Sequence, residues 1–429
     1  MRQRGRGLIP LWILLVLLVA VIGAEAGALL WARTAPPQDA AEEPASQAET
    51  EQETPEQESP EQARPETGDV SEPGETPEPE TPETPEEPEI PAEPTAAQRA
   101  REILDGMTLE EKVGQMFLAR CPETGAQAAA SDYHLGGYLL FARDFEGRTP
   151  DSVRETIAGY QSAAEVPLLI GVDEEGGTVT RVSRYPAFRS ERFGSPQEVY
   201  QAGGFDAVAS DTAEKCELLA DLGINVNFAP VCDISQDADD FIYDRSFGQG
   251  AEETAEYVRT VVEAMRDTGV ACVLKHFPGY GDNADTHTGI AYDDRPYETF
   301  QTSDFLPFQA GIDSGAELVL VAHNVVSCMD GDQPASLSPE VHRILREELG
   351  FPGVIVTDDL AMDGVRDFAP DDEVAVRAVQ AGNDLLCCTD FETQIPAVLA
   401  AVEDGTLDEA RIDESVLRIL ELKISLGLL

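Results

Sequence analysis

The chain has 429 residues, which is enough for one large domain or two small ones. Its formal charge is -53, from 82 acidic and 29 basic residues, and such a negative chain argues against nucleic acid or anionic lipid as a partner. The seven cysteines include no C-x-x-C pair and several lie in apolar runs, so we predict buried thiols and no disulfide framework.

Residues 1–33 are predicted to be a signal peptide or a signal-anchor transmembrane helix. Arg2, Arg4 and Arg6 precede an apolar run over residues 8–24, close to the ~20 residues that a spanning helix needs. Basic residues before such a run place the amino terminus in the cytoplasm. We therefore expect the rest of the chain on the extracellular face of the cell membrane, anchored by this helix, or secreted if the helix is cleaved.

Residues 34–97 are rich in Pro, Glu and Thr, with repeats such as T-P-E-P-E-T-P-E. They contain almost nothing to bury, and their acidic groups repel one another. The composition predicts a disordered, extended linker. A spacer is a simpler interpretation of it than a binding segment for a cationic partner.

Residues 98–429 are predicted to form a single (β/α)8 barrel of the TIM type. Eight apolar, strand-like runs cover residues 115–119, 138–142, 168–173, 226–231, 270–277, 318–323, 354–359 and 385–388. Helical stretches between and after them include residues 149–164, 207–222, 252–267, 338–349, 373–381 and 408–426. Apolar strands joined by helical crossovers indicate a parallel sheet covered on both faces. Eight such units fit a closed barrel better than an open doubly wound sheet, and no G-x-G-x-x-G or G-K-[ST] motif favours nucleotide binding.

Polar side chains stand at the carboxyl ends of these predicted strands, where barrel enzymes carry their active sites. They are Asp173 after the third strand, Arg245 on the loop after the fourth, Lys275 and His276 at the end of the fifth, His323 after the sixth and Asp358 after the seventh. Polar groups at the strand starts would instead have indicated a structural role.

Some of these residues have a structural interpretation as well. A lone histidine after an apolar run, as at His276 and His323, is often a satisfied core residue. In the pair Asp358-Asp359, the second residue suits a helix N-cap, where a carboxylate binds free backbone N–H groups. Asp358 is one residue closer to the strand, so we expect it to point into the barrel mouth.

The sharpest chemical signal is Asp285 and His287, two residues apart on the loop after the fifth predicted strand. A carboxylate can hold an imidazole in one tautomer, and an imidazole with a pKa near ~6.5 can act as a general acid and base near neutral pH. A carboxylate nucleophile facing it from another strand would complete a double-displacement site for glycoside hydrolysis. Lys275, Arg245 and Asp173 would then bind sugar hydroxyls.

Four ordered motifs resemble those of the β-N-acetylhexosaminidases of glycoside hydrolase family 3. They are G-V-D-x-E-G-G-x-V-x-R, D-R-S-F-G, K-H-F-P-G-x-G-D-x-x-D-x-H and I-V-T-D-D-L-x-M, and the resemblance covers nearly all of residues 98–429. It implies a barrel with a retaining mechanism. Relatives that cleave plain glucosides usually have a second domain with a Glu acid/base; the D-x-H loop here implies the N-acetylglucosaminidase branch. The usual substrates of that branch are bacterial cell-wall fragments with a non-reducing N-acetylglucosamine.

The resemblance also implies roles for individual residues. The family nucleophile falls on Asp358, and its acid/base falls on His287 with Asp285 as partner. The substrate-binding residues fall on Asp173, Arg181, Arg245, Lys275 and His276. His323 is a further substrate-binding candidate from its place at a strand end. No metal or other cofactor is expected.

Two residues depart from the family pattern. Tyr280 stands where the motif P-G-H-G has its histidine, and Thr286 stands where D-S-H has its serine. The first change affects the expected packing of the loop or a contact next to the site. We expect it to bear on the preference for the leaving group rather than on the reaction class.

Three other functions compete with this one. A metal-dependent hydrolase would use the metal-binding residue types His276, His287, His323, Asp173 and Asp358, although no H-x-H follows the first strand. A non-catalytic wall-binding module is disfavoured because both catalytic candidates are present. A phosphorylase on the same barrel stays open, because a histidine acid/base does not repel phosphate.

The expected partners follow from the function and the amino terminus. They are N-acetylglucosamine-containing oligosaccharides or muropeptides, and the membrane through the amino-terminal helix. We expect a monomer with no nucleic-acid partner.

Overall fold

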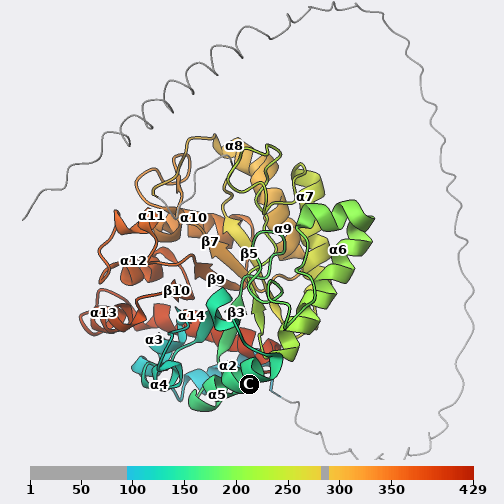
Figure 1. Cartoon of the computed structure of the whole chain (residues 1–429). Helices are drawn as coiled ribbons and strands as arrows, with labels where there is room; N and C mark the ends of the chain where they lie inside the picture. The colour runs from blue at the N-terminus through green and yellow to red at the C-terminus, as the bar shows by residue number, and fades with distance from the viewer. Residues whose placement is uncertain (1–93, 282–288) are drawn as a thin grey trace, which may run out of the picture. The chain divides into compact units, whose positions relative to one another are not determined.

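The computed structural model describes residues 94–281 and 289–429, and these ranges form a (β/α)8 barrel, as predicted (Figure 1). The predicted signal or anchor helix, and nearly all of the predicted linker, lie outside the described residues. Within the described ranges, no helix combines the length and the apolar character that a bilayer span requires.

Eight parallel strands form the barrel wall. In spatial order they are β10 (Leu386–Cys388), β1 (Phe117–Arg120), β2 (Gly137–Leu140), β3 (Leu169–Val172), β4 (Val226–Asn227), β5 (Ala271–Phe277), β7 (Leu318–Val321) and β9 (Val354–Thr357). A parallel bridge between Val356 and Leu385 joins β9 to β10 and closes the sheet. Each predicted strand coincides with one of these, so the strand predictions are confirmed to within a few residues.

Helices surround the strands. They are α2 (Ala96–Leu104), α3 (Leu109–Gln115), α4 (Ala126–Asp132), α5 (Pro150–Ala163), α6 (Pro196–Asp221), α7 (Ala251–Met265), α8 (Tyr297–Thr299), α9 (Phe305–Asp313), α10 (Pro339–Arg343), α11 (Asp363–Arg366), α12 (Val374–Ala381), α13 (Phe391–Glu403) and α14 (Glu409–Ser425). Shorter turns are η1 (Ala142–Asp144), η2 (Phe300–Asp304), η3 (Ala335–Leu337) and η4 (Ile344–Glu348). α2 and α14, from the two ends of the barrel sequence, pack together and close the ring of helices (Figure 1).

Capping boxes begin several of these helices. The Thr108 hydroxyl accepts a hydrogen bond from the Glu111 N–H at 3.3 Å, and the Glu111 carboxylate accepts one from the Thr108 N–H at 2.7 Å. The same reciprocal pair forms at Thr95 and starts α2, so the barrel domain begins slightly before the predicted boundary at residue 98.

Some elements were not predicted. The periodicity predicted only the second half of α6, because Gly203 and Gly204 break the helical pattern and the helix kinks there. The short parallel ribbon of β6 (Tyr292–Asp293) and β8 (Val325–Val326) is too brief to leave an alternating pattern.

The interior of the barrel is apolar, with almost every strand side chain buried. Cys232, Cys272 and Cys387 are buried among these side chains as free thiols, which is the role their apolar surroundings predicted. Cys328 is exposed. The close packing of the wall leaves the polar strand ends to form the site.

Candidate active site

A cavity of about 600 Å³ opens at the carboxyl ends of the barrel strands. Of the predicted site residues it is lined by Asp173, Arg181, Arg245, Lys275, His276 and Asp358. These residues come from β3, β5 and β9 and from the loops that follow the strands. The cavity therefore has the location at which barrel enzymes bind their substrates.

Asp358 directly follows β9 and lines this cavity. Its Oδ1 accepts a hydrogen bond from the Asp359 N–H at 2.8 Å. The carboxylate of Asp359 is used differently, because it accepts hydrogen bonds from the N–H groups of Ala361 at 2.9 Å and Thr389 at 3.2 Å. Asp359 thus holds the loop together, as a capping residue does, and both aspartates line the cavity.

An alternating network of charges forms one wall of the cavity. Lys275 Nζ lies 2.7 Å from Asp173 Oδ1 and 2.6 Å from Glu175 Oε1. Arg245 binds Glu175 with two nitrogens, at 2.8 and 3.0 Å, and Arg181 Nη2 lies 3.6 Å from Asp173 Oδ2. Three cations and two carboxylates therefore hold one another in fixed positions.

Glu175 is the buried centre of this network, with 4% of its surface exposed. Burial by itself opposes ionisation, but Arg245 and Lys275 outweigh it and hold the pKa of Glu175 well below its ordinary value. Burial likewise opposes the charge on Arg245, and Glu175 more than compensates, so the pKa of Arg245 is raised. Both groups stay charged, and Asp173 is left as the partly exposed acceptor facing the cavity.

His276 is held in one tautomer by its neighbours. Its Nε2 lies 3.2 Å from Arg245 Nη2, and its Nδ1 lies 2.7 Å from Asp233 Oδ2. Arginine can only donate, so Nε2 must accept and Nδ1–H must donate to Asp233. His276 is 6% exposed and lines the cavity beside Arg245.

Tyr280, the residue that departs from the family pattern, packs beside His276. Its backbone N–H donates to Asp233 Oδ1 at 2.7 Å, and its ring meets the His276 ring edge to face with centroids 5.4 Å apart. The ring is 2% exposed. The replacement therefore changes the packing under the loop after β5, next to the substrate cavity.

His323 does not line the cavity. Its side chain is fully buried, with Nδ1 at 2.7 Å from Ser336 Oγ and Nε2 at 3.0 Å from the Asp359 carbonyl oxygen. The structure therefore places His323 outside the lining of the cavity, and its predicted role in substrate binding stays a prediction. A residue at a strand end can point into the barrel wall, and His323 supports the Asp358-Asp359 loop from beneath.

Asp285 and His287, the predicted acid/base pair, lie outside the described residues. The segment that follows them is anchored by ion pairs. Arg295 Nη1 lies 3.0 Å from Asp304 Oδ1, and Arg295 Nη2 lies 2.8 Å from Asp293 Oδ2. These ion pairs hold residues 293–295 against the start of α9.

Sequence reasoning missed three acidic residues of the site. Glu175 belongs to the same G-V-D-E-E-G-G motif as Asp173, and that motif was the available signal. Its neighbour Glu174 is fully buried and accepts hydrogen bonds from the N–H groups of residues 181–183, which shapes the loop. Asp233 follows the fourth predicted strand, so the strand-end rule could have found it.

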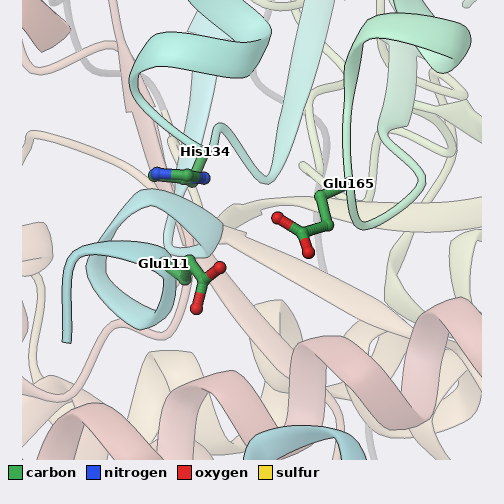
Figure 2. Close-up of side chains that lie close together, drawn as sticks. All are labelled: Glu111, His134 and Glu165. Atoms are coloured by element: carbon green, nitrogen blue, oxygen red, sulfur yellow. The ribbon is translucent and has the colours of Figure 1, made fainter. Parts of the chain in front are cut away.

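A cluster of metal-binding residue types lies elsewhere. Ligand atoms of Glu111, His134 and Glu165 all lie within 4.8 Å of one another, and their side chains face a shared space (Figure 2). These residues precede β1, β2 and β3, so they lie at the amino ends of the strands.

At the carboxyl ends of the strands, His276 and His323 form hydrogen bonds with other partners. The described part of the active site therefore does not assemble the ligand set that a metal-dependent hydrolase would need.

Comparison with known proteins identifies the family. The glycosyl hydrolase family 3 N terminal domain matches residues 108–422. A β-hexosaminidase of Nitrosomonas eutropha is 32% identical over 300 residues, covering 66% of this chain and 83% of the relative. A β-hexosaminidase of Mycobacterium tuberculosis is 31% identical over 326 residues, covering 73% and 82%.

A solved structure agrees with these sequence matches. The family 3 β-N-acetylglucosaminidase of a Paenibacillus species superposes with a TM-score of 0.70 at 34% identity, covering 75% of this chain and 63% of that one. The barrel, the cavity at its carboxyl end and the sequence matches agree. The chain belongs to glycosyl hydrolase family 3, within its β-N-acetylhexosaminidase branch.

Proposed function

We propose that this protein is a retaining exo-β-N-acetylglucosaminidase that uses Asp358 as its nucleophile and His287, oriented by Asp285, as its acid/base. The observation that carries the proposal is the position of Asp358. It lines the cavity at the end of β9, while the carboxylate of the adjacent Asp359 is used by the loop. The β-hexosaminidase relatives support the same reaction class.

The reaction takes two steps. In the first, a carboxylate oxygen of Asp358 attacks the anomeric carbon, the bond to the leaving oxygen breaks, and protonated His287 gives its proton to that oxygen. In the second, neutral His287 takes a proton from water, the water oxygen attacks the anomeric carbon, and the bond to Asp358 breaks. Two displacements on one carbon return the original anomeric configuration.

The charged wall of the cavity supplies the sugar-binding groups. Asp173 can accept hydrogen bonds from two hydroxyls while Lys275 and Arg181 neutralise its charge. Arg245 and Lys275 are held in place by Glu175, so they need little rearrangement when the sugar binds. A terminal sugar rich in hydroxyl groups fits such a wall better than an apolar ligand does.

We propose that the natural substrates are cell-wall fragments with a non-reducing N-acetylglucosamine, and that the enzyme acts as a monomer at the extracellular face of the membrane. The apolar run over residues 8–24 and the acidic linker support an anchor followed by a spacer. Fractionation of cells that express the full chain and a chain starting at residue 34 tests the anchor. Recovery of both in the same soluble fraction contradicts it, and size-exclusion chromatography with light scattering tests the monomer.

Two mechanistic alternatives share the same barrel. In a phosphorylase, phosphate would replace water in the second step and release N-acetylglucosamine 1-phosphate. In a metal-dependent hydrolase, a bound ion would activate the water. Neither alternative changes the expected role of Lys275 and Arg245 in holding the sugar.

The test is turnover by residues 94–429 of nitrophenyl N-acetyl-β-glucosaminide beside the matching β-glucoside, with and without phosphate and EDTA. We expect release of N-acetylglucosamine with retained configuration, unaffected by EDTA, and lost in Asp358→Asn and in His287→Ala. Activity that persists in Asp358→Asn contradicts the assigned nucleophile. A phosphate-dependent sugar phosphate would instead identify a phosphorylase, and loss of activity with EDTA a metal enzyme.

A further inference from the structure

Arg120, the last residue of β1, lies between two cavities. It lines the active-site cavity, and it also lines a neighbouring cavity of about 330 Å³, called here the outer cavity. Thr389 lines both cavities as well, whereas Arg143 lines only the outer one. The outer cavity therefore adjoins the site of Asp358 and can receive the group that is attached to the reacting sugar.

The guanidinium of Arg120 makes no hydrogen bond or ion pair with any residue in the described ranges. Its Nε is buried without a partner, and its Cζ lies 4.5 Å from the centroid of the Phe141 ring. Arg181 and Arg245, in the same cavity, each pair with a carboxylate. An unpaired, partly buried arginine is unexpected in a chain with 82 acidic residues, because a cation that has lost water needs a counter-charge.

The acidic groups around Arg120 are engaged elsewhere or form no pair with it. Burial raises the pKa of Asp144 although Arg143 and Arg120 oppose the shift, and its Oδ2 accepts a hydrogen bond from the Phe141 N–H at 2.7 Å. On the wall of the outer cavity, Asp390 accepts a hydrogen bond from Thr393, and Glu392 is exposed. Carboxylates such as Asp173 and Asp358 line the active-site cavity with Arg120, but none in the described ranges forms an ion pair with it.

We propose that Arg120 forms an anion-binding subsite on the leaving-group side of the active site. Its ligand is a small oxyanion, either a carboxylate carried by the leaving group or free phosphate. A planar guanidinium can bind two oxygens of either anion at once, and the Phe141 face keeps it in position. The proposal rests on the proposed function, because it takes the cavity at Asp358 as the site of the sugar.

The test compares two coumarin N-acetyl-β-glucosaminides that differ only by a carboxylate or a carboxamide on the coumarin ring. The ratio of kcat/KM for the carboxylate to that for the carboxamide is measured for the parent enzyme, Arg120→Gln and Arg120→Lys. Arg143→Gln removes the same charge from the outer cavity and is the matched control. A parallel series adds inorganic phosphate and measures its effect on turnover of the carboxamide.

We expect Arg120→Gln to lower the ratio by about tenfold, the scale of one charge-assisted hydrogen-bonded pair. Arg120→Lys should keep part of the preference, and Arg143→Gln should leave the ratio within about twofold of the parent, because its charge is balanced by Glu123. If phosphate is the ligand, Arg120→Gln instead abolishes the effect of phosphate. Equal loss on both glycosides, with the phosphate effect unchanged, overturns the proposal and makes Arg120 a contact of the sugar itself.

A binding measurement separates this proposal from the proposed function. Calorimetric titration of Asp358→Asn, alone and with Arg120→Gln, with the two glycosides and with phosphate requires no turnover. If the enzyme cleaves neither glycoside, the proposed function fails, yet the titration still decides whether Arg120 selects an anion. If Arg120→Gln changes the affinity for none of the three ligands, the proposed subsite is overturned.

Discussion

Charged side chains of the active site position one another across long stretches of sequence. Glu175 lies between Lys275 and Arg245, which are 100 and 70 residues away along the chain, and all three are largely buried. Such a network needs every member, because removing one partner leaves an opposite charge in a site with little water. Each residue therefore affects both stability and catalysis.

Replacing Glu175 by glutamine should damage both properties. We expect a loss of about 3 kcal/mol in the free energy of unfolding, the lower end for a broken buried pair, because Asp173 still binds Lys275. Because Arg245 and Lys275 lose their anchor, kcat/KM should fall at least about tenfold. Urea unfolding and steady-state kinetics measure the two effects. Exposed Glu263→Gln on α7 is the control, and parent-like values in Glu175→Gln would contradict the network.

The same residue predicts a dependence of stability on pH. Although burial opposes it, pairing with Arg245 and Lys275 lowers the pKa of Glu175 below its ordinary 4.5. A carboxyl group whose pKa is lowered by folding stabilises the fold at a pH above its unfolded-state pKa. This stabilisation is lost as the pH falls towards the folded-state pKa. The stability difference between the parent and Glu175→Gln should be full above pH 4.5 and shrink below it. A difference that grows on acidification would contradict the assignment.

Lys423, at the amino end of the barrel, predicts a trend of the same sign at higher pH. It is fully buried, its Nζ donates to Gln115 Oε1 at 2.6 Å, and burial lowers its pKa from 10.5 to about 7. The unfolded chain then binds more protons between these values, so this residue makes stability rise with pH from 7 to 10.5. Relative to Lys423→Met, the parent should gain stability over that range, by about 5 kcal/mol at most. A flat difference in urea unfolding would contradict the shifted pKa.

At the scale of elements, strand ends provide the chemistry and loops complete it. The loop after β5 follows Lys275 and His276 and continues towards Asp285 and His287. Arg295 anchors its far side by binding Asp293 and Asp304. Asp304 is 3% exposed, and burial raises its pKa to about 6 even though Arg295 opposes the shift.

Replacing Arg295 by glutamine should loosen this loop. The carboxylates of Asp293 and Asp304 would then repel each other without the cation that now lies between them, so the segment after the loop should shift. We expect kcat to fall by about tenfold or more while the affinity for N-acetylglucosamine changes less, because the sugar-binding wall lies on other elements. Exposed Arg259→Gln on α7 is the control. Equal kcat in Arg295→Gln and the parent would show that the ion pairs of Arg295 do not position the acid/base.

At the scale of the whole molecule, the described lining of the active-site cavity belongs to the barrel. Its described lining runs from Arg120 to Thr389 and includes no residue before α2. The amino-terminal segment is expected to determine location and reach rather than chemistry. We expect the acidic linker to contribute to solubility and spacing.

Removal of residues 1–93 should leave catalysis unchanged. We expect kcat/KM on a small aryl glycoside to agree within about twofold between the detergent-solubilised full chain and residues 94–429, since both contain the complete cavity. On intact cell walls, only the full chain should act close to the membrane. A large loss on the small glycoside after truncation would show that the amino-terminal segment contributes to the site.

The sequence alone determined the barrel and several of the charged residues that line its mouth. Apolar strands, helical crossovers and polar strand ends are local patterns, because each is written in consecutive residues. The same patterns placed Asp173, Lys275, His276 and Asp358 correctly at the carboxyl face. They could not distinguish His323, because a strand-end side chain can point into the wall as readily as into the mouth.

Only the tertiary structure decided which charges meet. The pairing of Glu175 with Lys275 and Arg245, the orientation of His276 by Asp233, and the unpaired guanidinium of Arg120 depend on the register of strands that the chain brings together only when the barrel closes. Electrostatic energy depends on distance and burial in space, and neither is encoded in the spacing of residues along the chain.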